Sequence, residues 1–418
     1  MENPKRKKIY FLPMHDVQML PFSERSSVAH AIAWADRVLP DLDTEDIASV
    51  HSDGRVLART ITSRVNVPGF HRSMMDGFAV RAIEIEKATE SDPVLLRVAG
   101  EIYPGDATPR SMAAGQAVRI MTGAPVPAGA DAVIPVEHVH LRESAILIDH
   151  PVIAGKHVGL PGEDVACGQC VLEAGRRIRP QDIGLLSSIG INSVSVLRKP
   201  RVHLVTTGNE LLPAGTTPVD CMIADANSPM LKSLVNRDGG EFTFSGIVPD
   251  NPASILEALK VDTDILIISG GSSVGCEDYV PHLLARYGEL GIHGIRMRPG
   301  SPIGMGMFQN HPVFILPGNP VACLCGYDFF AGRAIRNLTG RGSALPYRRN
   351  RIPLGESLKS IEGRTDYVRV QVTADGVFKS SQQGASMLFS AVQSDGFLII
   401  PESAAVVSPG ETVTVYYY

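Results

Sequence analysis

Between about residues 201 and 340, short apolar runs alternate with stretches whose apolar residues recur at helical spacing. The runs RVHLVTTG and TDILIISGG are rich in β-branched residues, as buried parallel strands are. The stretches NSPMLKSLVNRDGG and EDYVPHLLARYG have the period of amphipathic helices, and a longer helix is expected from Val321 to about Leu338. This alternation predicts an α/β domain at 200–341, with a parallel sheet between two layers of helices.

The pattern changes on both sides of this region. Apolar and polar residues alternate with period two from about 342 to 418, which predicts a small β-barrel or sandwich. Short strands separated by Gly and Pro turns predict a β-rich unit at about 59–149. The segments SVAHAIAWADRVLP and TEDIASVHSDGRVLAR, within residues 21–58, have helical patterns with Pro40 between them. Residues 1–20 are polar and are expected to form a flexible tail.

Length and charge narrow the class of protein. A chain of 418 residues fits two to four domains, and its net charge of −5 gives no reason to expect a nucleic-acid partner. No apolar run approaches the roughly 20 residues that a membrane span needs, and Pro13 interrupts the apolar segment after the basic KRKK, unlike a signal peptide. The expected compartment is therefore the cytoplasm.

Cysteine spacing adds one candidate site. Six cysteines in 418 residues do not form a disulfide framework, which agrees with a reducing compartment. Cys167 and Cys170 in CGQC have the spacing of a metal or redox pair. Because no second pair stands at zinc-site distance, plain thiols in a β-turn are the favoured interpretation.

The turn SGGSSVGCEDY is the first candidate for a ligand site. It joins an expected strand end to a helix start, and its glycines allow the backbone to approach an anion closely. Glu277 and Asp278 would repel a bare phosphate, so the turn indicates phosphate together with a divalent cation. The alternative is a serine-capped turn that binds nothing.

Other strand ends strengthen this interpretation. Ligands of open α/β sheets gather at the carboxyl ends of the strands, where TTGNE, VPDN, SGGSSVG, MRPGSP and LPGNP are expected. Glu210, Asp250 and Asp278 would meet at this edge. Converging carboxylates beside glycine turns predict a metal-assisted phosphate site.

Seven motifs, in order, resemble one family, the molybdopterin molybdenumtransferases, which include bacterial MoeA and the gephyrin E domain. The motifs are SMMDGFAV, RIMTGAPVPAGADAVIPVE, GED, TTGNEL, SGGSSVGCEDY, RPGSP and LPGNPV. The resemblance covers residues 20–418. It implies an elongated N-terminal domain at 21–58 and 150–199, an inserted β domain at 59–149, a molybdopterin-binding α/β domain at 200–341 and a C-terminal β-barrel at 342–418.

The resemblance implies an enzyme that completes molybdenum cofactor biosynthesis. Such enzymes insert molybdenum from molybdate into adenylylated molybdopterin and release AMP, with Mg²⁺ as the cofactor. Members are homodimers in which the inserted domain of one subunit completes the active site of the other. No nucleic-acid or membrane partner is implied.

The resemblance also assigns roles to individual residues. Catalytic roles fall to Glu210, Asp250, Asp278 and Asp76, and the first three of these are the expected metal ligands. Substrate binding is expected of Gly270, Gly271, Ser273, Thr122, Arg298, Ser301, Pro317, Asn319 and Pro320. Arg364, Arg369 and Ser390 loosely resemble a molybdate-facing set. The structural alternatives are helix caps and solvated turns for the acids, and an ordinary Asp-Gly turn for Asp76.

Several departures from the family pattern concern the oxyanion half of the site. RPGSP stands where the family commonly has KPGKP, so that Arg298 and Ser301 replace lysines, and Ala322 replaces a serine. The loss of an ammonium group removes positive charge near a dianion. The alternative function is therefore a paralogue that carries molybdopterin or its adenylate, with weak metal insertion or with a preference for tungstate.

Overall fold

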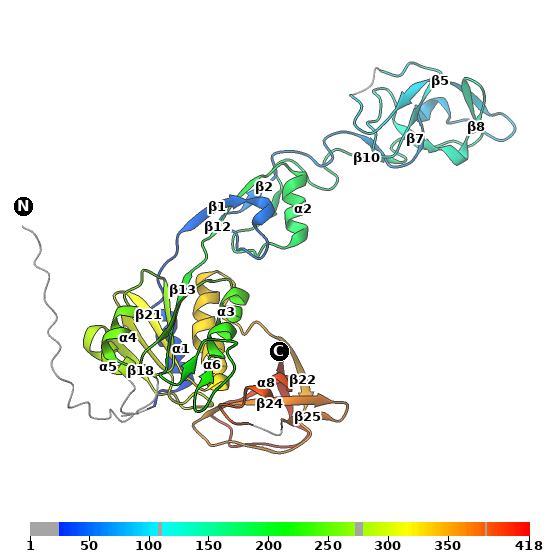
Figure 1. Cartoon of the computed structure of the whole chain (residues 1–418). Coiled ribbons are helices and arrows are strands. Elements are labelled where there is room, and N and C mark those ends of the chain that lie inside the picture. Colours follow the sequence, from blue (N-terminus) through cyan, green and yellow to red (C-terminus); the bar gives the residue numbers. More distant parts are fainter. Residues whose placement is uncertain (1–24, 108–110, 272–278, 381–382) are drawn as a thin grey trace, which may run out of the picture. The chain divides into compact units, whose positions relative to one another are not determined.

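The computed structural model describes residues 25–107, 111–271, 279–380 and 383–418 (Figure 1). The chain divides into two compact units. The first, here called the main unit, comprises Met1–Glu45 and Leu197–Tyr418. The second, here called the inserted unit, comprises Asp46–Val196.

A mixed sheet of six strands forms the centre of the main unit. Its strand order is β16 (Glu241–Val248), β13 (Arg201–Thr207), β17 (Ile265–Ser269), β21 (His311–Leu316), β20 (Gly304–Phe308) and β18 (Glu289–His293). The first four strands are parallel, which confirms the predicted alternation. β20 is antiparallel to β21, because a tight turn at Gln309 and Asn310, both with positive φ, joins the two strands, and β18 is antiparallel to β20.

Helices cover both faces of this sheet (Figure 1). One face carries α1 (Val28–Arg37), α3 (Asn227–Asp238), α6 (Pro320–Gly326) and α7 (Gly332–Leu338), and the other carries α4 (Pro252–Ala258) and α5 (Tyr279–Tyr287). Successive β17 residues alternate between the two cores, since Ile265 and Ile267 pack in the first and Leu266 and Ile268 in the second. The predicted helix at 321–338 is present as α6 and α7, joined by a π-helical turn at Tyr327–Ala331.

The N-terminal helix α1 packs differently from the expected grouping of residues 21–58 with 150–199. Trp34 and Ala35 lie in the same hydrophobic core as Ile292 and Ile295. Gly291 lies directly against the Trp34 indole, where a β-carbon would clash with the ring. The hydrophobic face of α1 therefore completes the main unit.

The helix expected at TEDIASVHSDGRVLAR is wrong. Thr44–Ala48 forms strand β1, which pairs with β12 (Ser193–Leu197), and a short 3₁₀ turn follows at Ser49–His51. The Ser49 amide donates to the Asn192 carbonyl at 2.9 Å. Pairing with a strand almost 150 residues further along the chain satisfies the backbone, and it overrides the local helical period.

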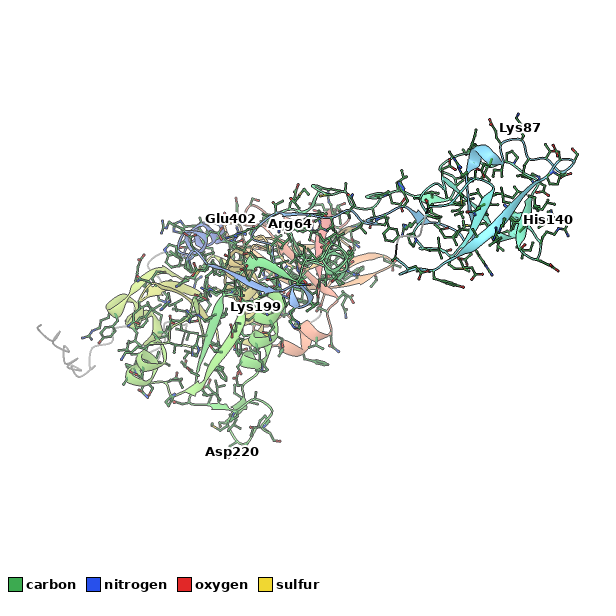
Figure 2. The ribbon with its side chains drawn as sticks, turned by 90° about the horizontal axis from the view of Figure 1, so that it is seen from above. Arg64, Lys87, His140, Lys199, Asp220 and Glu402 are labelled. Atoms are coloured by element: carbon green, nitrogen blue, oxygen red, sulfur yellow. The ribbon has the colours of Figure 1, made fainter. Side chains whose placement is uncertain are left out.

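The inserted unit contains the predicted β-rich region. Its six-stranded sheet has the order β7 (Ala132–Pro135), β4 (Gly77–Val80), β6 (Gln116–Ile120), β5 (Val94–Ile102), β9 (Ala145–Ile148) and β8 (His140–Leu141). Shorter pairs join β2 (Ile61–Thr62) to β11 (Cys170–Leu172) and β3 (Arg72–Ser73) to β10 (Val158–Gly159), and α2 spans Pro180–Ser188. His140, labelled in Figure 2, is exposed on β8, and its Nε2 lies 2.9 Å from Oδ2 of Asp149.

The C-terminal residues of the main unit form a second sheet, as the period-two pattern predicts. Its order is β19 (Met297–Arg298), β24 (Thr365–Thr373), β26 (Gly396–Ile400), β28 (Thr412–Tyr417) and β22 (Arg348–Pro353), with β25 (Gly376–Lys379) paired to β24. A short pair, β23 (Leu358–Lys359) with β27 (Val406–Val407), lies beside it. The Tyr367 and Phe397 rings stack at 4.1 Å and belong to the same core as Phe329, so the two parts of the main unit share apolar contacts.

Buried charges accompany this aromatic contact. Asp328, in the π-helical turn, is fully buried, and its carboxylate accepts hydrogen bonds from the Tyr347 hydroxyl at 3.0 Å and from Arg237 Nη2 at 3.2 Å. Asp238 accepts from Arg336 Nη1 at 2.8 Å. Burial raises the pKa of Asp328 to about 6, although the cation of Arg237 opposes this.

The raised pKa predicts a stability that depends on pH. In an unfolded chain an aspartate titrates near pH 3.9, so the folded state of this protein holds the Asp328 proton more tightly. The free energy that this proton contributes to the stability of the folded state is largest below about pH 4, and it is lost as the pH rises through about 6. Relative to D328N, we expect the wild-type unfolding free energy to fall by about 2 kcal/mol between pH 4 and pH 7.

Urea unfolding followed by the fluorescence of Trp34, the only tryptophan, measures this difference in the main unit. The variant D41N, at an exposed aspartate, is the control and should follow the wild-type pH profile. Parallel profiles for wild type and D328N would contradict the assignment.

Candidate active site

A pocket of about 600 Å³ lies at the carboxyl edge of the parallel strands in the main unit. The ends of β13, β17 and β21 contribute to it, together with the loops that follow them. The lining residues are 206–208, 210–211, 223–227, 250, 269–271, 302, 317–320 and 386. This is the edge at which open α/β sheets bind their ligands.

Two of the predicted acidic residues, Glu210 and Asp250, line this pocket. Asp250 is held to the residue before Glu210: the Asn209 amide donates to Asp250 Oδ2, and the Asp250 amide donates to Asn209 Oδ1, both at 3.2 Å. This reciprocal pair fixes the loop after β16 against the loop after β13. Glu210 and Asp250 thus line one pocket, as expected of strand ends at the same edge of the sheet.

The predicted phosphate turn begins with an unusually close backbone approach. Gly270 has a φ of +104°, and a β-carbon there would lie 2.5 Å from the Thr207 carbonyl oxygen. No side chain fits between the ends of β13 and β17 at this point. Gly271 also has positive φ and also lines the pocket, and the Gly270 amide donates to the Leu316 carbonyl.

The predicted turn at 317–320 forms the neighbouring wall. Pro317, Asn319 and Pro320 all line the pocket, and Pro320 is the first residue of α6. Gly318 faces Gly270, since a β-carbon on Gly318 would lie at an ordinary van der Waals distance, 3.9 Å, from the Gly270 α-carbon. The two glycine turns are thus packed side by side.

Sequence reasoning missed the side chain that joins these turns. Asn227, at the start of α3, donates from Nδ2 to Ser269 Oγ at 2.9 Å and to the Gly318 carbonyl at 2.8 Å. Asp225 was also missed as the residue that caps this helix: its Oδ1 accepts from the amides of Asn227 and Ser228. A carboxylate two residues before a helix start was the available signal.

The charged side chains in the described lining of the pocket are all acidic. Its described lining includes the carboxylates of Glu210, Asp225 and Asp250 but no lysine or arginine. Asp225 is committed to two backbone amides, whereas the other two carboxylates face the pocket without a cationic neighbour in its lining. An anionic ligand therefore needs an additional cation to bind here.

Ser273 and Asp278, the other predicted members of this turn, lie outside the described residues. Their roles stay predictions. Within the described ranges, no three His, Cys, Asp or Glu side chains are grouped closely enough to hold a metal ion by themselves.

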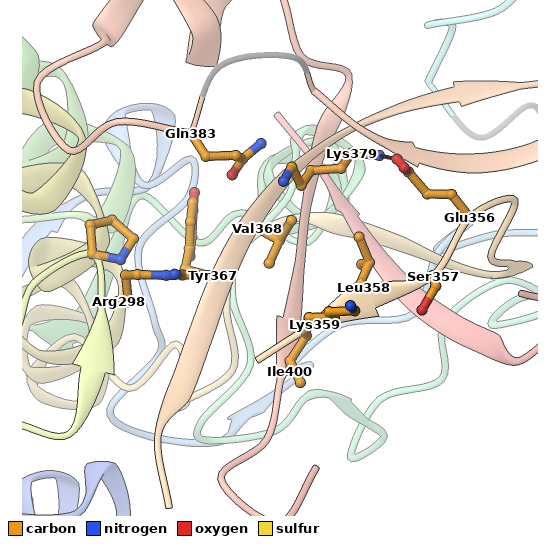
Figure 3. A pocket seen from close by; sticks show the side chains of 11 residues that line it. Arg298, Glu356, Ser357, Leu358, Lys359, Tyr367, Val368, Lys379, Gln383 and Ile400 are labelled. Atoms are coloured by element: carbon orange, nitrogen blue, oxygen red, sulfur yellow. Dashed lines mark hydrogen bonds between the residues drawn. The ribbon is translucent and has the colours of Figure 1, made fainter. Parts of the chain in front are cut away.

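Arg298 lies at a different pocket, of about 380 Å³, on the C-terminal sheet (Figure 3). Lys359 and Lys379 also line this pocket. Arg298 Nη2 is 2.8 Å from Oδ2 of the buried Asp366, which Arg364 also contacts through Nε at 2.7 Å. Sequence analysis gave no signal for Asp366, because it is 68 residues from Arg298.

The remaining residues of the predicted oxyanion set are buried or bonded locally. The Ser301 hydroxyl is buried and has no hydrogen-bond partner among the described residues. Arg369 is 1% exposed and donates from Nη2 to the Gly384 carbonyl at 3.2 Å. Ser390 Oγ donates to the Met387 carbonyl, as a local turn bond. The side chains of Arg369 and Ser390 therefore stabilise the backbone of the C-terminal residues.

Asp76 and Thr122 pair within the inserted unit. The Thr122 amide and its hydroxyl both donate to Asp76 Oδ1, at 2.7 and 2.8 Å. Both hydrogen bonds lower the pKa of Asp76, and the bond from the Thr122 backbone amide has the larger effect. The Asp76 carboxylate is therefore ionised and held in place by Thr122.

The cysteines of the described residues differ in their exposure. Cys167 and Cys170 are exposed free thiols at a turn and at the start of β11. Cys323 is buried beneath the pocket, and its burial raises the pKa of the thiol to about 12, so that it stays protonated. The helices in the described ranges are too short or too polar to cross a membrane.

Comparisons with known proteins agree with this architecture. The chain matches three family models: the MoeA N-terminal region (domain I and II) at 26–190, a probable molybdopterin binding domain at 203–337, and the MoeA C-terminal region (domain IV) at 351–418. The second of these matches contains most of the 600 Å³ pocket.

Relatives match over most of their length. Molybdopterin molybdenumtransferase 2 of Mycobacterium tuberculosis is 34% identical over 377 residues, which cover 87% of this chain and 93% of the relative. The molybdopterin molybdenumtransferase of Haemophilus influenzae is 33% identical, with 89% and 93% covered. The crystal structure of the molybdopterin biosynthesis MoeA protein from Pyrococcus horikosii has a TM-score of 0.81 and 32% identity, covering 94% of this chain and 99% of that one. The chain belongs to the MoeA family of molybdopterin molybdenumtransferases.

Proposed function

We propose that this protein transfers molybdenum from molybdate to adenylylated molybdopterin and releases AMP, as the last step of cofactor assembly. The single observation that carries the proposal is the 600 Å³ pocket, in which Glu210, Asp250 and the Gly270 turn meet at the carboxyl edge of the sheet. The names of the relatives support the same chemistry. The proposed compartment is the cytoplasm.

The residues of the pocket have distinct proposed tasks. The backbone at Gly270 and Gly271 receives a phosphate of the substrate, and the turn at 317–320 shapes the wall beside it. Ser273 and Asp278, which follow in the sequence, are assigned to the substrate phosphate and to the cation. Arg298, fixed by Asp366, contributes positive charge to molybdate binding, and Ser301 contributes a hydroxyl.

The proposed cofactor is Mg²⁺. Glu210 and Asp250, with Asp278, supply the oxygen ligands that this ion prefers, and Mg²⁺ commonly uses one or two carboxylates together with substrate phosphates and water. The two described carboxylates therefore fit the ion even though they do not form a complete cage. When bound, Mg²⁺ neutralises the phosphoanhydride oxygens that these acids would otherwise repel.

The proposed active assembly is a homodimer with shared sites. Asp76 and Thr122 are held ready by their two hydrogen bonds, yet they belong to the inserted unit and not to the residues that line the pocket. In this proposal, the partner copy contributes them to the pocket. No nucleic acid or membrane takes part.

The two acidic residues of the pocket can be tested by substitution. Purified protein incubated with adenylylated molybdopterin, Mg²⁺ and molybdate should release AMP and yield the molybdenum cofactor. E210Q and D250N should each lower the rate of AMP release by at least roughly 10-fold, with a higher Mg²⁺ requirement, because each removes one carboxylate ligand. D262N, at an exposed aspartate outside the pocket, is the control. AMP release that ignores molybdate, without metal insertion, contradicts the proposal.

The shared site predicts complementation between inactive variants. If D76N and E210Q are each inactive, random exchange of subunits makes half of the dimers mixed, and each mixed dimer has one intact site. The mixture should therefore recover about a quarter of the wild-type rate of AMP release. Mixed samples no faster than the separate variants, despite demonstrated subunit exchange, would rule out the shared site.

The close backbone approach at Gly270 predicts that alanine is tolerated at Gly318 but not at Gly270. G270A should lower the melting temperature and abolish substrate binding, because the new methyl group meets the Thr207 carbonyl and the positive φ is strained, at a cost of about 1–3 kcal/mol. G318A should retain binding, since its nearest neighbour is 3.9 Å away. Thermal unfolding and titration with adenylylated molybdopterin measure both effects; equal behaviour of the two variants would refute the argument.

A further inference from the structure

Asn227 is the only one of the described residues whose side chain joins the two glycine turns of the pocket by hydrogen bonds. Its Nδ2 donates to Ser269 Oγ at 2.9 Å, directly before Gly270, and to the Gly318 carbonyl at 2.8 Å. Asn227 is 6% exposed and Ser269 is 1% exposed, so both bonds lie in a protected environment. Hydrogen bonds of this kind are costly to break, because the groups left behind cannot reach water.

The orientation of the Asn227 amide is determined by its partners. The Gly318 carbonyl can only accept, so the atom that faces it must be the NH₂ group. The Oδ1 atom is then fixed on the opposite side. This oxygen is buried and has no donor among the described residues, although Asn227 lines the pocket. A buried acceptor without a partner is the sign of a group that a ligand or a bound water satisfies.

A purely local role does not account for this side chain. Asp225 already caps α3, because its Oδ1 accepts from the backbone amides of Asn227 and Ser228. The amide group of Asn227 is therefore not needed to begin the helix. Thr206 and Thr207, at the neighbouring strand end, also have buried hydroxyl groups without partners among the described residues, so the unsatisfied polar atoms gather at the floor of the pocket.

We propose that Asn227 is a positioning residue of the active site. Through Ser269 and Gly318 it holds the Gly270 turn and the 317–320 wall at the spacing that binds adenylylated molybdopterin, and its Oδ1 accepts a hydrogen bond from an N–H or O–H group of that substrate. This role rests on the proposed function and adds to it a residue outside the predicted acidic and glycine sets.

The test compares N227A, S269A and the double variant. The control is N236A, which removes the same group from an exposed position of the same helix. The dissociation constant is measured through the fluorescence of adenylylated molybdopterin, and the kcat and KM of AMP release are measured in parallel. We expect N227A to raise the dissociation constant and KM by roughly 10- to 100-fold, while N236A stays within about twofold of wild type. The loss in the double variant should equal that of N227A, because both changes break the same contact.

Two results would overturn the proposal: a dissociation constant of N227A equal to that of wild type, or losses from N227A and S269A that multiply. If N227A does not fold, S269A decides alone, and an unchanged dissociation constant counts against the role. A wild-type protein that binds the substrate but releases no AMP contradicts the proposed function, whereas the comparison of dissociation constants still decides the role of Asn227.

Discussion

The pocket depends on a backbone approach so close that no side chain fits within it. The turn after β17 lies against the end of β13, and only a glycine with positive φ can occupy position 270. The neighbouring turn then packs against this glycine through Gly318. Once these backbones are fixed, the carboxylates of Glu210 and Asp250 have defined places at the same edge. The shape of the pocket therefore depends on the lack of a side chain at position 270.

Charge is distributed unevenly over the main unit. The charged side chains in the described lining of the pocket at the sheet edge are all acidic, whereas the C-terminal pocket is lined by Arg298, Lys359 and Lys379 with one acid, Glu356. Asp366 is buried between two arginines, and it fixes their guanidinium groups at the expense of part of their charge. An arginine at position 298, where the family pattern has lysine, keeps a positive charge. Its planar guanidinium group has several donors, so it can bind a carboxylate and an oxyanion together.

Local periodicity predicted the parts of the fold in which local and global requirements agree. The central strands and the helices of 201–338 follow from it, since β13, β17, β20 and β21 are buried on both faces and the helices pack apolar side chains against the sheet. It failed at β1, where pairing with a distant strand decides the structure. It also could not identify Asn227 or Asp366 as site residues, because their partners are distant in the chain and become neighbours only through the fold.

The pairing of β1 with β12 bears on how the inserted unit is connected to the rest of the chain. The two strands lead into and out of residues 46–196, so the ends of that long insertion leave the main unit as neighbours. A segment whose ends are adjacent can be gained, lost or exchanged without altering the strand order of its host. The inserted unit is thus a module that evolution could add to an ancestral α/β protein, and that protein engineering could replace with a short hairpin.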